Sequence, residues 1–364
     1  MKRKNLLINL EGLGWDHFFE AEFRKAGIPD TVPARVTSQH KDLCIIQDEK
    51  GELAAAISGR IRYRAGAGTS YPVVGDWVAA SLRVGERSAV IRAVLPRKSS
   101  FSRQATGGRV KAQVLVANID IVFLVSGLDG GRNLNLRRIE RYLMLAWNSG
   151  ARPVIILNKV DLCKNIEPVV REAEGIAPGV PVHAISATER IRLDTLRQYL
   201  TGGNTAALLG HSGTGKSAII NALLGEERLK VGSVREADRR GRHTTTRREL
   251  LLLPGGGAVI DTPGMRGIQV RGDEEGLRDT FEDIESLAGQ CRFYDCAHDK
   301  EPGCAVRGAI ESGSLDPARL NSYRKLQLEL RHQTARENNN ARLEEKFRWK
   351  RISQMAKQLR KHKQ

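Results

Sequence analysis

Residues 206–225 read AALLGHSGTGKSAIINALLG. Within them, Gly210 to Ser217 fit the pattern G-x-x-x-x-G-K-[ST] of a phosphate-binding loop. The apolar residues before the loop predict a short buried strand, and Ser217–Leu224 predict a helix that Gly225 ends. The order strand, loop, helix is the context that such a loop requires. The alternative interpretation is a glycine-rich turn that only caps a helix.

The residues of this loop are suited to hold the phosphates of a nucleotide. Glycines let consecutive N–H groups face one anion at the positive end of a helix. We expect Lys216 to reach the β- and γ-phosphates and the Ser217 hydroxyl to hold Mg²⁺. The predicted phosphate-binding residues are Gly210, His211, Ser212, Gly213, Thr214, Gly215, Lys216 and Ser217.

A second motif, Asn158-Lys159-Val160-Asp161, follows the largely apolar residues 152–157. Such a run is typical of a buried parallel strand, and ligands bind at the carboxyl ends of these strands. The Asp161 carboxylate can accept hydrogen bonds from N1–H and the N2 amine of guanine, whereas adenine offers no such pair and would leave the carboxylate unsatisfied. Lys159 can lie over the base. Alone, this motif is equally well explained by a turn, but together with a phosphate loop it predicts guanine binding.

Ser186-Ala187-Thr188 end another apolar stretch, Val182–Ile185. They resemble the backbone loop that contacts O6 of guanine in GTPases. The predicted base-binding residues are therefore Asn158, Lys159, Asp161, Ser186 and Ala187.

Two further segments resemble the nucleotide-sensing switches of a GTPase. Asp261-Thr262-Pro263-Gly264 match D-x-x-G, in which Asp261 acts on Mg²⁺ through water and Gly264 senses the γ-phosphate. Upstream, residues 241–246 read GRHTTT and resemble a switch I segment, in which one threonine completes the Mg²⁺ shell. Thr244 and Thr245 are the candidates. A solvated polar loop is the alternative for this run.

Many GTPases place a glutamine directly after D-x-x-G to orient the attacking water, but here that residue is Met265. Methionine cannot orient water, so we expect hydrolysis to be slow unless another group or a partner supplies the polar contact. His243 is a candidate because an imidazole can position or deprotonate water. It is equally a candidate for an ordinary surface histidine.

A cluster of metal-binding residue types lies towards the C-terminus. Cys291, Cys296, His298 and Cys304 offer four ligands within a short segment, which predicts a tetrahedral Cys₃His zinc site. Four protein ligands leave no open position, so the site is expected to be structural. Unrelated thiols and a bystander histidine are the alternative. Cys44 and Cys163 stand alone in apolar runs and are expected to be small core residues.

The chain has 364 residues and a net charge of +17, and it contains no apolar run long enough to span a membrane. Residues 315–364 carry fourteen Lys and Arg against five Asp and Glu, a surplus of nine. Such a tail is typical of nucleic-acid binding, and it lacks the apolar face that a membrane surface requires. The cysteines cluster with a histidine, which favours metal binding over disulfides. The first residues are too polar for a signal peptide, so we expect a cytoplasmic location.

The N-terminal part predicts a small β-barrel because short β-like runs alternate with polar turns. A short helical lead-in precedes it, and strands alternating with helices follow it, which predicts a parallel sheet covered by helices. The C-terminal part predicts a helix over Thr280–Leu287, then the metal segment, then a long basic helix from Pro317 onward. The β-like runs are Ala34–Thr37, Leu43–Gln47, Leu53–Ile57, Ile61–Tyr63, Asp76–Ser81 and Ala89–Val94.

The guanine motif precedes the phosphate loop, the reverse of the usual order in GTPases. Two further features accompany this order: the Cys/Cys/His/Cys cluster and the segment Val74-Gly75-Asp76-Trp77-Val78. In all three features the chain resembles the circularly permuted GTPases of the RsgA (YjeQ) family. The resemblance covers about residues 31–330 and implies an OB-type barrel, a permuted P-loop α/β GTPase domain and a zinc-binding, mostly helical domain. The predicted parts are 1–30, 31–109, 110–272 and 273–364.

The resemblance further implies a protein that binds GTP with Mg²⁺, carries one structural Zn²⁺ and hydrolyses GTP in late maturation of the small ribosomal subunit, stimulated by that subunit. The expected partners are GTP or GDP and the small subunit with its rRNA, and nothing in the sequence demands more than a monomer. Two other hypotheses remain. One is a zinc-stabilised RNA scaffold whose nucleotide pocket is catalytically inert, which Met265 would suit. The other is a permuted GTPase that serves another RNA or a membrane.

Overall fold

A computed structural model describes residues 9–40, 43–65, 71–83, 85–103, 113–129, 134–229, 248–261 and 273–335. The described residues fall into two compact units, one within 1–103 and 114–271 and the other mainly within 272–364. Across these ranges, no helix is long and apolar enough to cross a membrane. The predictions on residues 241–246, on 262–265 and on the chain beyond 335 lie outside the described residues.

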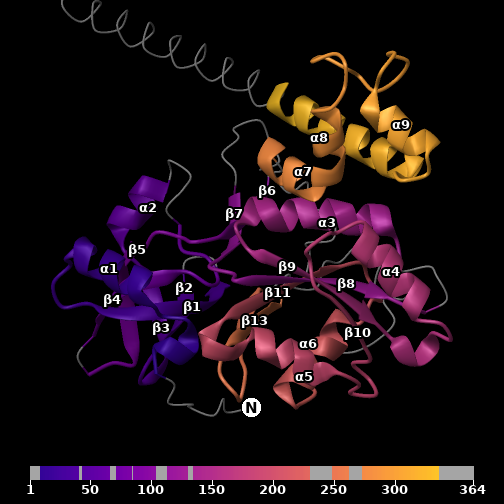
Figure 1. Cartoon of the computed structure of the whole chain (residues 1–364). Coiled ribbons are helices and arrows are strands. Elements are labelled where there is room, and N and C mark those ends of the chain that lie inside the picture. The colour runs from indigo at the N-terminus through magenta and orange to yellow at the C-terminus, as the bar shows by residue number, and fades with distance from the viewer. Residues whose placement is uncertain are drawn as a thin grey trace, which may run out of the picture. The chain divides into compact units, whose positions relative to one another are not determined.

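The first unit contains the predicted N-terminal barrel, which has five strands in the order β1-β2-β3-β5-β4 and closes through pairing of β1 with β4 (Figure 1). Only β3 and β5 are parallel; the other neighbours are antiparallel. This topology is that of an OB-type barrel. The strands are β1 (Val32–His40), β2 (Leu43–Asp48), β3 (Gly51–Ile57), β4 (Trp77–Leu82) and β5 (Ser88–Val94).

One predicted strand of the barrel was wrong. Ile61–Tyr63 belong to a short helix, α2 (Gly59–Ala65), in which the Arg62 N–H donates to the Ser58 carbonyl oxygen at 3.1 Å. Ile57 and Ile61 are buried in the barrel core, while the residues around Ile61 are exposed. The bond from Arg62 to Ser58 joins residues four positions apart, which is the hydrogen bond of an α-helix and not of a strand.

A twisted sheet with helices on its two faces follows the barrel, as predicted. Its strand order is β10-β9-β8-β11-β13-β12, and all neighbours except β12 and β13 are parallel. In Figure 1, α3 lies on one face and α5 and α6 lie on the other. The elements are β8 (Ile121–Gly127), α3 (Leu136–Ser149), β9 (Arg152–Asn158), α4 (Glu167–Gly175), β10 (Val182–Ile185), α5 (Leu193–Tyr199), β11 (Thr205–Gly210), α6 (Lys216–Leu224), β12 (Glu249–Leu252) and β13 (Ala258–Asp261).

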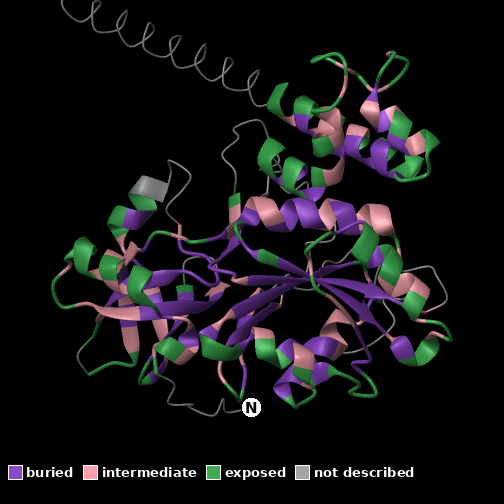
Figure 2. Cartoon of the chain, in the orientation of Figure 1, coloured by how far each residue is buried: buried purple, intermediate pink, exposed green. Residues whose placement is uncertain are grey.

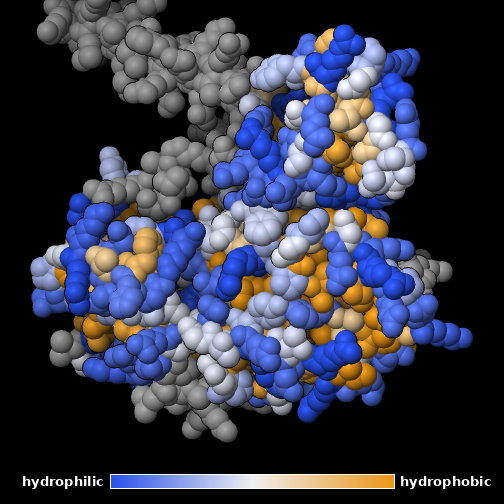
Figure 3. Space-filling model, viewed as in Figure 1, coloured by the Kyte–Doolittle hydropathy of each residue, from blue (hydrophilic) through white to orange (hydrophobic). Residues whose placement is uncertain are grey.

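Burial explains why these strands read as apolar runs in the sequence. Every residue of β8 and β11 is buried, and Figure 2 shows the central strands buried and the covering helices buried on their inner sides only. Gly150 and Gly225 end α3 and α6 in the left-handed conformation, with φ of 80° and 74°. On the face seen in Figure 3, hydrophilic residues predominate over the barrel, whereas hydrophobic residues show among polar ones over the sheet domain.

The sequence did not predict that a strand of the barrel pairs with a strand of the parallel sheet. β12 pairs with β1 at Ser38 and Glu249, so both belong to one sheet of 11 strands. The buried Arg35 guanidinium reinforces this junction by donating to the carbonyl oxygens of Leu13, Gly75 and Asn118. Burial lowers the Arg35 pKa to about 10. The N-terminal segment contributes α1 (His17–Ala26) and, through Leu13, one of these three carbonyls.

The second unit is helical around the metal-ligand segment. The helix predicted over Thr280–Leu287 corresponds to α8 (Glu282–Ala288), which begins two residues later because the chain turns at Phe281, whose φ is −121° and ψ is 38°. Arg319, on the helix of residues 317–335, makes a bidentate ion pair with Asp283 at 2.6 and 2.7 Å. The other helices are α7 (Glu274–Thr280) and α9 (Ala305–Glu311).

Candidate functional site

The predicted nucleotide-binding residues lie at one edge of the sheet. The five strands β8, β9, β10, β11 and β13 run parallel, so their carboxyl ends share this edge. The phosphate loop follows β11, the motif at residues 158–161 begins at the last residue of β9, and Ser186 follows β10. Asp261 is the last residue of β13. Permutation of the chain therefore changes the order of the motifs but not the edge where they meet.

The glycines of the phosphate loop are required by its geometry. Gly215 precedes α6 with φ of +93°, and a Cβ there would lie 2.2 Å from Nδ2 of Asn158. At Gly210, a Cβ would lie 2.4 Å from the carbonyl oxygen of Val125. Both positions are too close to neighbouring atoms for any side chain, so the loop curls tightly between β8 and β9.

Lys216, the first residue of α6, bends back over the loop. Its Nζ donates to the carbonyl oxygens of Gly210 at 2.8 Å and His211 at 2.7 Å. Because these bonds join Lys216 at the end of the loop to the first two residues of the loop, the ammonium group is held within the loop, where a phosphate would need a cation. Ser217 follows it and is half-buried.

Asn158 connects two loops of the site. Its Nδ2 donates to the carbonyl oxygen of Thr214 at 2.9 Å, and its Oδ1 accepts from the Ala187 N–H at 3.0 Å. The side chain is 2% exposed, so both bonds are shielded from water. The residue predicted to bind nucleotide thus ties the phosphate loop to the Ser186-Ala187-Thr188 loop.

Lys159 and Asp161 lie on the short turn after β9. Lys159 has a left-handed backbone, with φ of +69°, and its Nζ lies 2.5 Å from Oδ2 of Asp129. Asp161 is exposed and Ser186 is fully buried. Asp129 was not predicted from the sequence, although an acidic residue just after the strand β8 was the available signal.

Several predicted residues cannot be placed at this edge. His243, Thr244, Thr245, Gly264 and Met265 lie outside the described residues, and their roles stay predictions. Of the D-x-x-G motif, only Asp261 is described.

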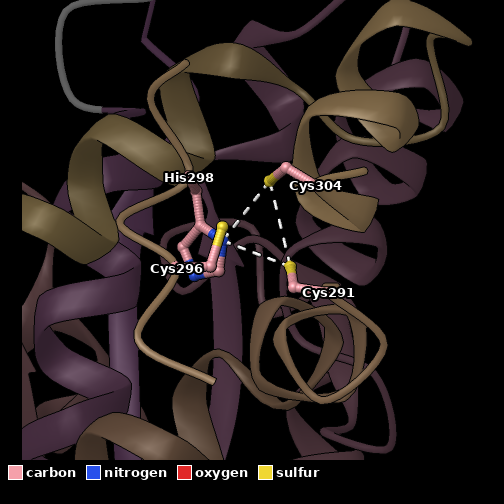
Figure 4. Close-up of side chains that lie close together, drawn as sticks. All are labelled: Cys291, Cys296, His298 and Cys304. Atoms are coloured by element: carbon pink, nitrogen blue, oxygen red, sulfur yellow. Dashed lines mark hydrogen bonds between the residues drawn. The ribbon is translucent and has the colours of Figure 1, made fainter. Parts of the chain in front are cut away.

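The four predicted metal ligands come together in the second unit. Their ligand atoms all lie within 4.8 Å of one another, and Figure 4 shows the side chains pointing toward a common centre. Nδ1 of His298 lies 3.5 Å from each of the Cys291 and Cys304 sulfurs, which are 3.9 Å apart. Tetrahedral zinc, with bonds of about 2.3 Å to sulfur and about 2.0 Å to nitrogen, would separate such atoms by about 3.5–3.8 Å.

Polar groups around the cluster fix the loop that carries His298. The Glu301 carboxylate accepts from the N–H groups of Ala297, Asp299 and Lys300, at 2.8 to 3.0 Å. Bonds from backbone N–H groups, first its own and that of Asp299, lower the Glu301 pKa to about 2. Arg324 donates to the carbonyl oxygen of His298 at 2.9 Å. These contacts hold His298 in its left-handed conformation, with φ of +59°.

The start of α9 favours the thiolate form of Cys291. Burial disfavours its ionisation, but the N–H groups of Val306 and Ala305 at the start of α9 outweigh that effect, and its pKa is lowered. A thiolate is the form that binds metal. The prediction that Cys44 is a core residue is confirmed, whereas Cys163 is only half-buried and that prediction was wrong.

The parallel sheet, its phosphate loop and the reversed motif order define the chain as a circularly permuted GTPase. Residues 94–271 match the sequence profile of the RsgA GTPase family. Curated relatives named small ribosomal subunit biogenesis GTPase RsgA include one from Opitutus terrae, 45% identical over 95% of this chain and 96% of its own. A second, from Streptomyces avermitilis, is 42% identical over 93% of this chain and 90% of its own. The chain belongs to the RsgA family.

Solved structures agree with this assignment. The crystal structure of YjeQ from Thermotoga maritima is 29% identical and covers 82% of this chain and 98% of its own, with a TM-score of 0.62. YloQ, described as a circularly permuted GTPase, shares the fold at a TM-score of 0.58 and 21% identity, over 83% of this chain and 96% of its own. The protein is therefore a GTP hydrolase, and a catalytically inert scaffold is set aside.

Proposed function

We propose that this GTPase binds the small ribosomal subunit through its rRNA and hydrolyses GTP to GDP and phosphate during late maturation of that subunit, which stimulates the reaction. The observation that carries the proposal is the similarity, over nearly the whole chain, to relatives named for small-subunit biogenesis. The surplus of nine positive charges in residues 315–364 supports an RNA partner, because basic segments bind phosphate backbones by releasing counterions.

The barrel offers a second basic surface. On α2, Arg60 and Arg62 are exposed, and Tyr63 is 90% exposed. Neither arginine has an ion-pair partner within the part of the chain that the structure describes. Unpaired arginines beside an exposed aromatic ring suit contact with phosphates and with unpaired bases.

Phosphate release from GTP tests the assigned partner. With the protein alone we expect slow turnover, because Met265 stands where many GTPases have a water-orienting glutamine. Purified small subunits should raise the rate by at least about 10-fold, and a supplied arginine can raise it by about 10³-fold or more in other GTPases. Equal stimulation by large subunits or by bare RNA would keep the chemistry but contradict the assigned partner.

We assign the catalytic roles as follows. Lys216 binds the β- and γ-phosphates, Ser217 and Asp261 hold Mg²⁺, Asp261 through water, and Asp161 reads the guanine edge. Gly264 senses the γ-phosphate, Thr244 or Thr245 completes the Mg²⁺ shell, and His243 positions the attacking water. The first four residues are supported by their shared position at one edge of the sheet. The roles of Gly264, of the two threonines and of His243 are supported by their sequence motifs.

Changing Asp161 to asparagine tests the base reader. The amide can accept only through its single oxygen, so one of the two guanine donors loses its acceptor. We expect GDP affinity to fall by about 10²-fold or more, since an unpaired buried polar group costs several kcal/mol, while xanthosine diphosphate gains affinity. Competition against a fluorescent GDP analogue measures both changes. Unaltered preference for GDP would assign base recognition to another residue.

We assign Zn²⁺ to the four-ligand cluster in a structural role. Cys291, Cys296, His298 and Cys304 would hold it, and the ion would supply part of the folding energy of this polar segment. The distances between the ligand atoms match zinc geometry, and three thiolates favour a soft ion.

The remaining assignments follow from the proposed role. A factor that acts on ribosomal subunits as they mature works in the cytoplasm, and we assign this protein there as a monomer. We also divide the chain into four parts. Residues 1–30 are an N-terminal extension, 31–109 the OB-type barrel, 110–272 the permuted GTPase domain and 273–364 the zinc-binding domain.

A further inference from the structure

We propose that Asp129 positions Lys159 for binding of the guanine base. This inference rests on the proposed GTP binding and on the predicted role of Lys159, whose side chain is expected to lie over the guanine base. Oδ2 of Asp129 lies 2.5 Å from Nζ of Lys159, and the two side chains are 24% and 25% exposed. The pair is therefore partly shielded from water, and its attraction is screened less than that of a surface pair.

The backbones bring the two residues together. In the parallel pair β8–β9, Gly127 lies opposite Asn158, and the Leu128 N–H donates to the Asn158 carbonyl oxygen at 2.8 Å. Asp129 and Lys159 follow directly where the two strands end. The left-handed backbone of Lys159, with φ of +69°, sets the direction in which its side chain leaves the turn.

The ion pair with Asp129 restricts the conformations of the Lys159 side chain. A free lysine samples many rotamers, and binding a base against its aliphatic stem would require ordering that stem. With the ammonium group held by Asp129, the stem is already directed and the base meets a prepared surface. Asp161 still selects guanine through hydrogen bonds, so Asp129 should affect how long nucleotide stays bound rather than which base is bound.

The test is the dissociation rate of methylanthraniloyl-GDP from the full chain. In Asp129→Ala we expect dissociation to be about fivefold faster, the size that one partly exposed ion pair can account for. The preference for GDP over ADP should stay as in the wild type, because Asp161 still selects the base. As a matched control, Asp194→Ala breaks the exposed pair with Arg197, 2.6 Å on α5, and should leave dissociation unchanged.

A double-mutant cycle separates positioning from general damage. In a Lys159→Ala background, Asp129→Ala should cause no further acceleration, because the group it positions is gone. Unchanged dissociation in Asp129→Ala, or equal acceleration in both backgrounds, would overturn the proposal for Asp129 alone. A wild-type protein that fails to bind methylanthraniloyl-GDP would overturn the proposed function as well.

Discussion

Replacing Lys216 with alanine is expected to reduce GTP turnover by about 10²- to 10³-fold or more, the usual cost of removing one group that stabilises charge in a transition state. The Lys216 ammonium lies inside the phosphate loop, where it contacts the carbonyl oxygens of Gly210 and His211. In phosphoryl transfer, catalysis depends on positioning and on neutralising negative charge, and the loop backbone offers only partial charges for that purpose. Single-turnover phosphate release with and without small subunits measures the effect.

Lys50→Ala is a suitable control for this experiment. Lys50 is exposed on the turn between β2 and β3, and its side chain should not affect intrinsic hydrolysis. Loss of a loop cation should also weaken nucleotide binding, so turnover must be compared at saturating GTP. A Lys216→Ala protein that hydrolyses GTP at the wild-type rate would show that this lysine does not act on the phosphates.

Removing the metal ion is expected to unfold the loop of residues 291–304 while leaving the first unit folded. Zinc binding contributes about 10–16 kcal/mol to folding of small zinc-finger peptides at neutral pH. Here the loss should be smaller, because the second unit has its own core, including Phe281 and the partly buried ion pair between Arg319 and Asp283. Chelation or Cys304→Ser should expose residues 291–304 to protease, and the metal content should fall from one equivalent towards none.

Cys163→Ser provides the matched control for this prediction. Cys163 is a half-buried thiol outside the cluster, so its replacement should retain the metal. Binding of GDP should survive in Cys304→Ser, because the nucleotide-binding edge belongs to the other unit. A Cys304→Ser protein that still holds a full equivalent of metal would contradict the assigned ligand set.

Local patterns predicted much of the nucleotide-binding edge. β10 was predicted with its observed bounds, and α6 within one residue, because a short apolar strand and a glycine-capped helix leave signals in adjacent residues. The metal ligands were likewise predictable, since all four lie within residues 291–304 and cysteine and histidine are the usual ligands of zinc. In both cases, the interaction that determines the structure acts between residues close together in the chain.

Long-range contacts account for what was missed. Ile61 read as part of a strand because a short apolar run fits either period, and the structure instead buries it in the barrel core from the short helix α2. Asp129 and Lys159 are 30 positions apart, and no local pattern pairs them. Their contact depends on the register of β8 against β9.

The sequence by itself determined the chemistry of this protein: a phosphate loop, a guanine-reading motif and a set of metal ligands, each encoded by residue types at short spacing. Only the tertiary structure decided how these parts are supported. Asn158 ties two loops together, and β12 joins the sheet domain to the barrel strand β1. Such contacts are selected by packing and strand pairing between distant segments, which composition and spacing do not specify.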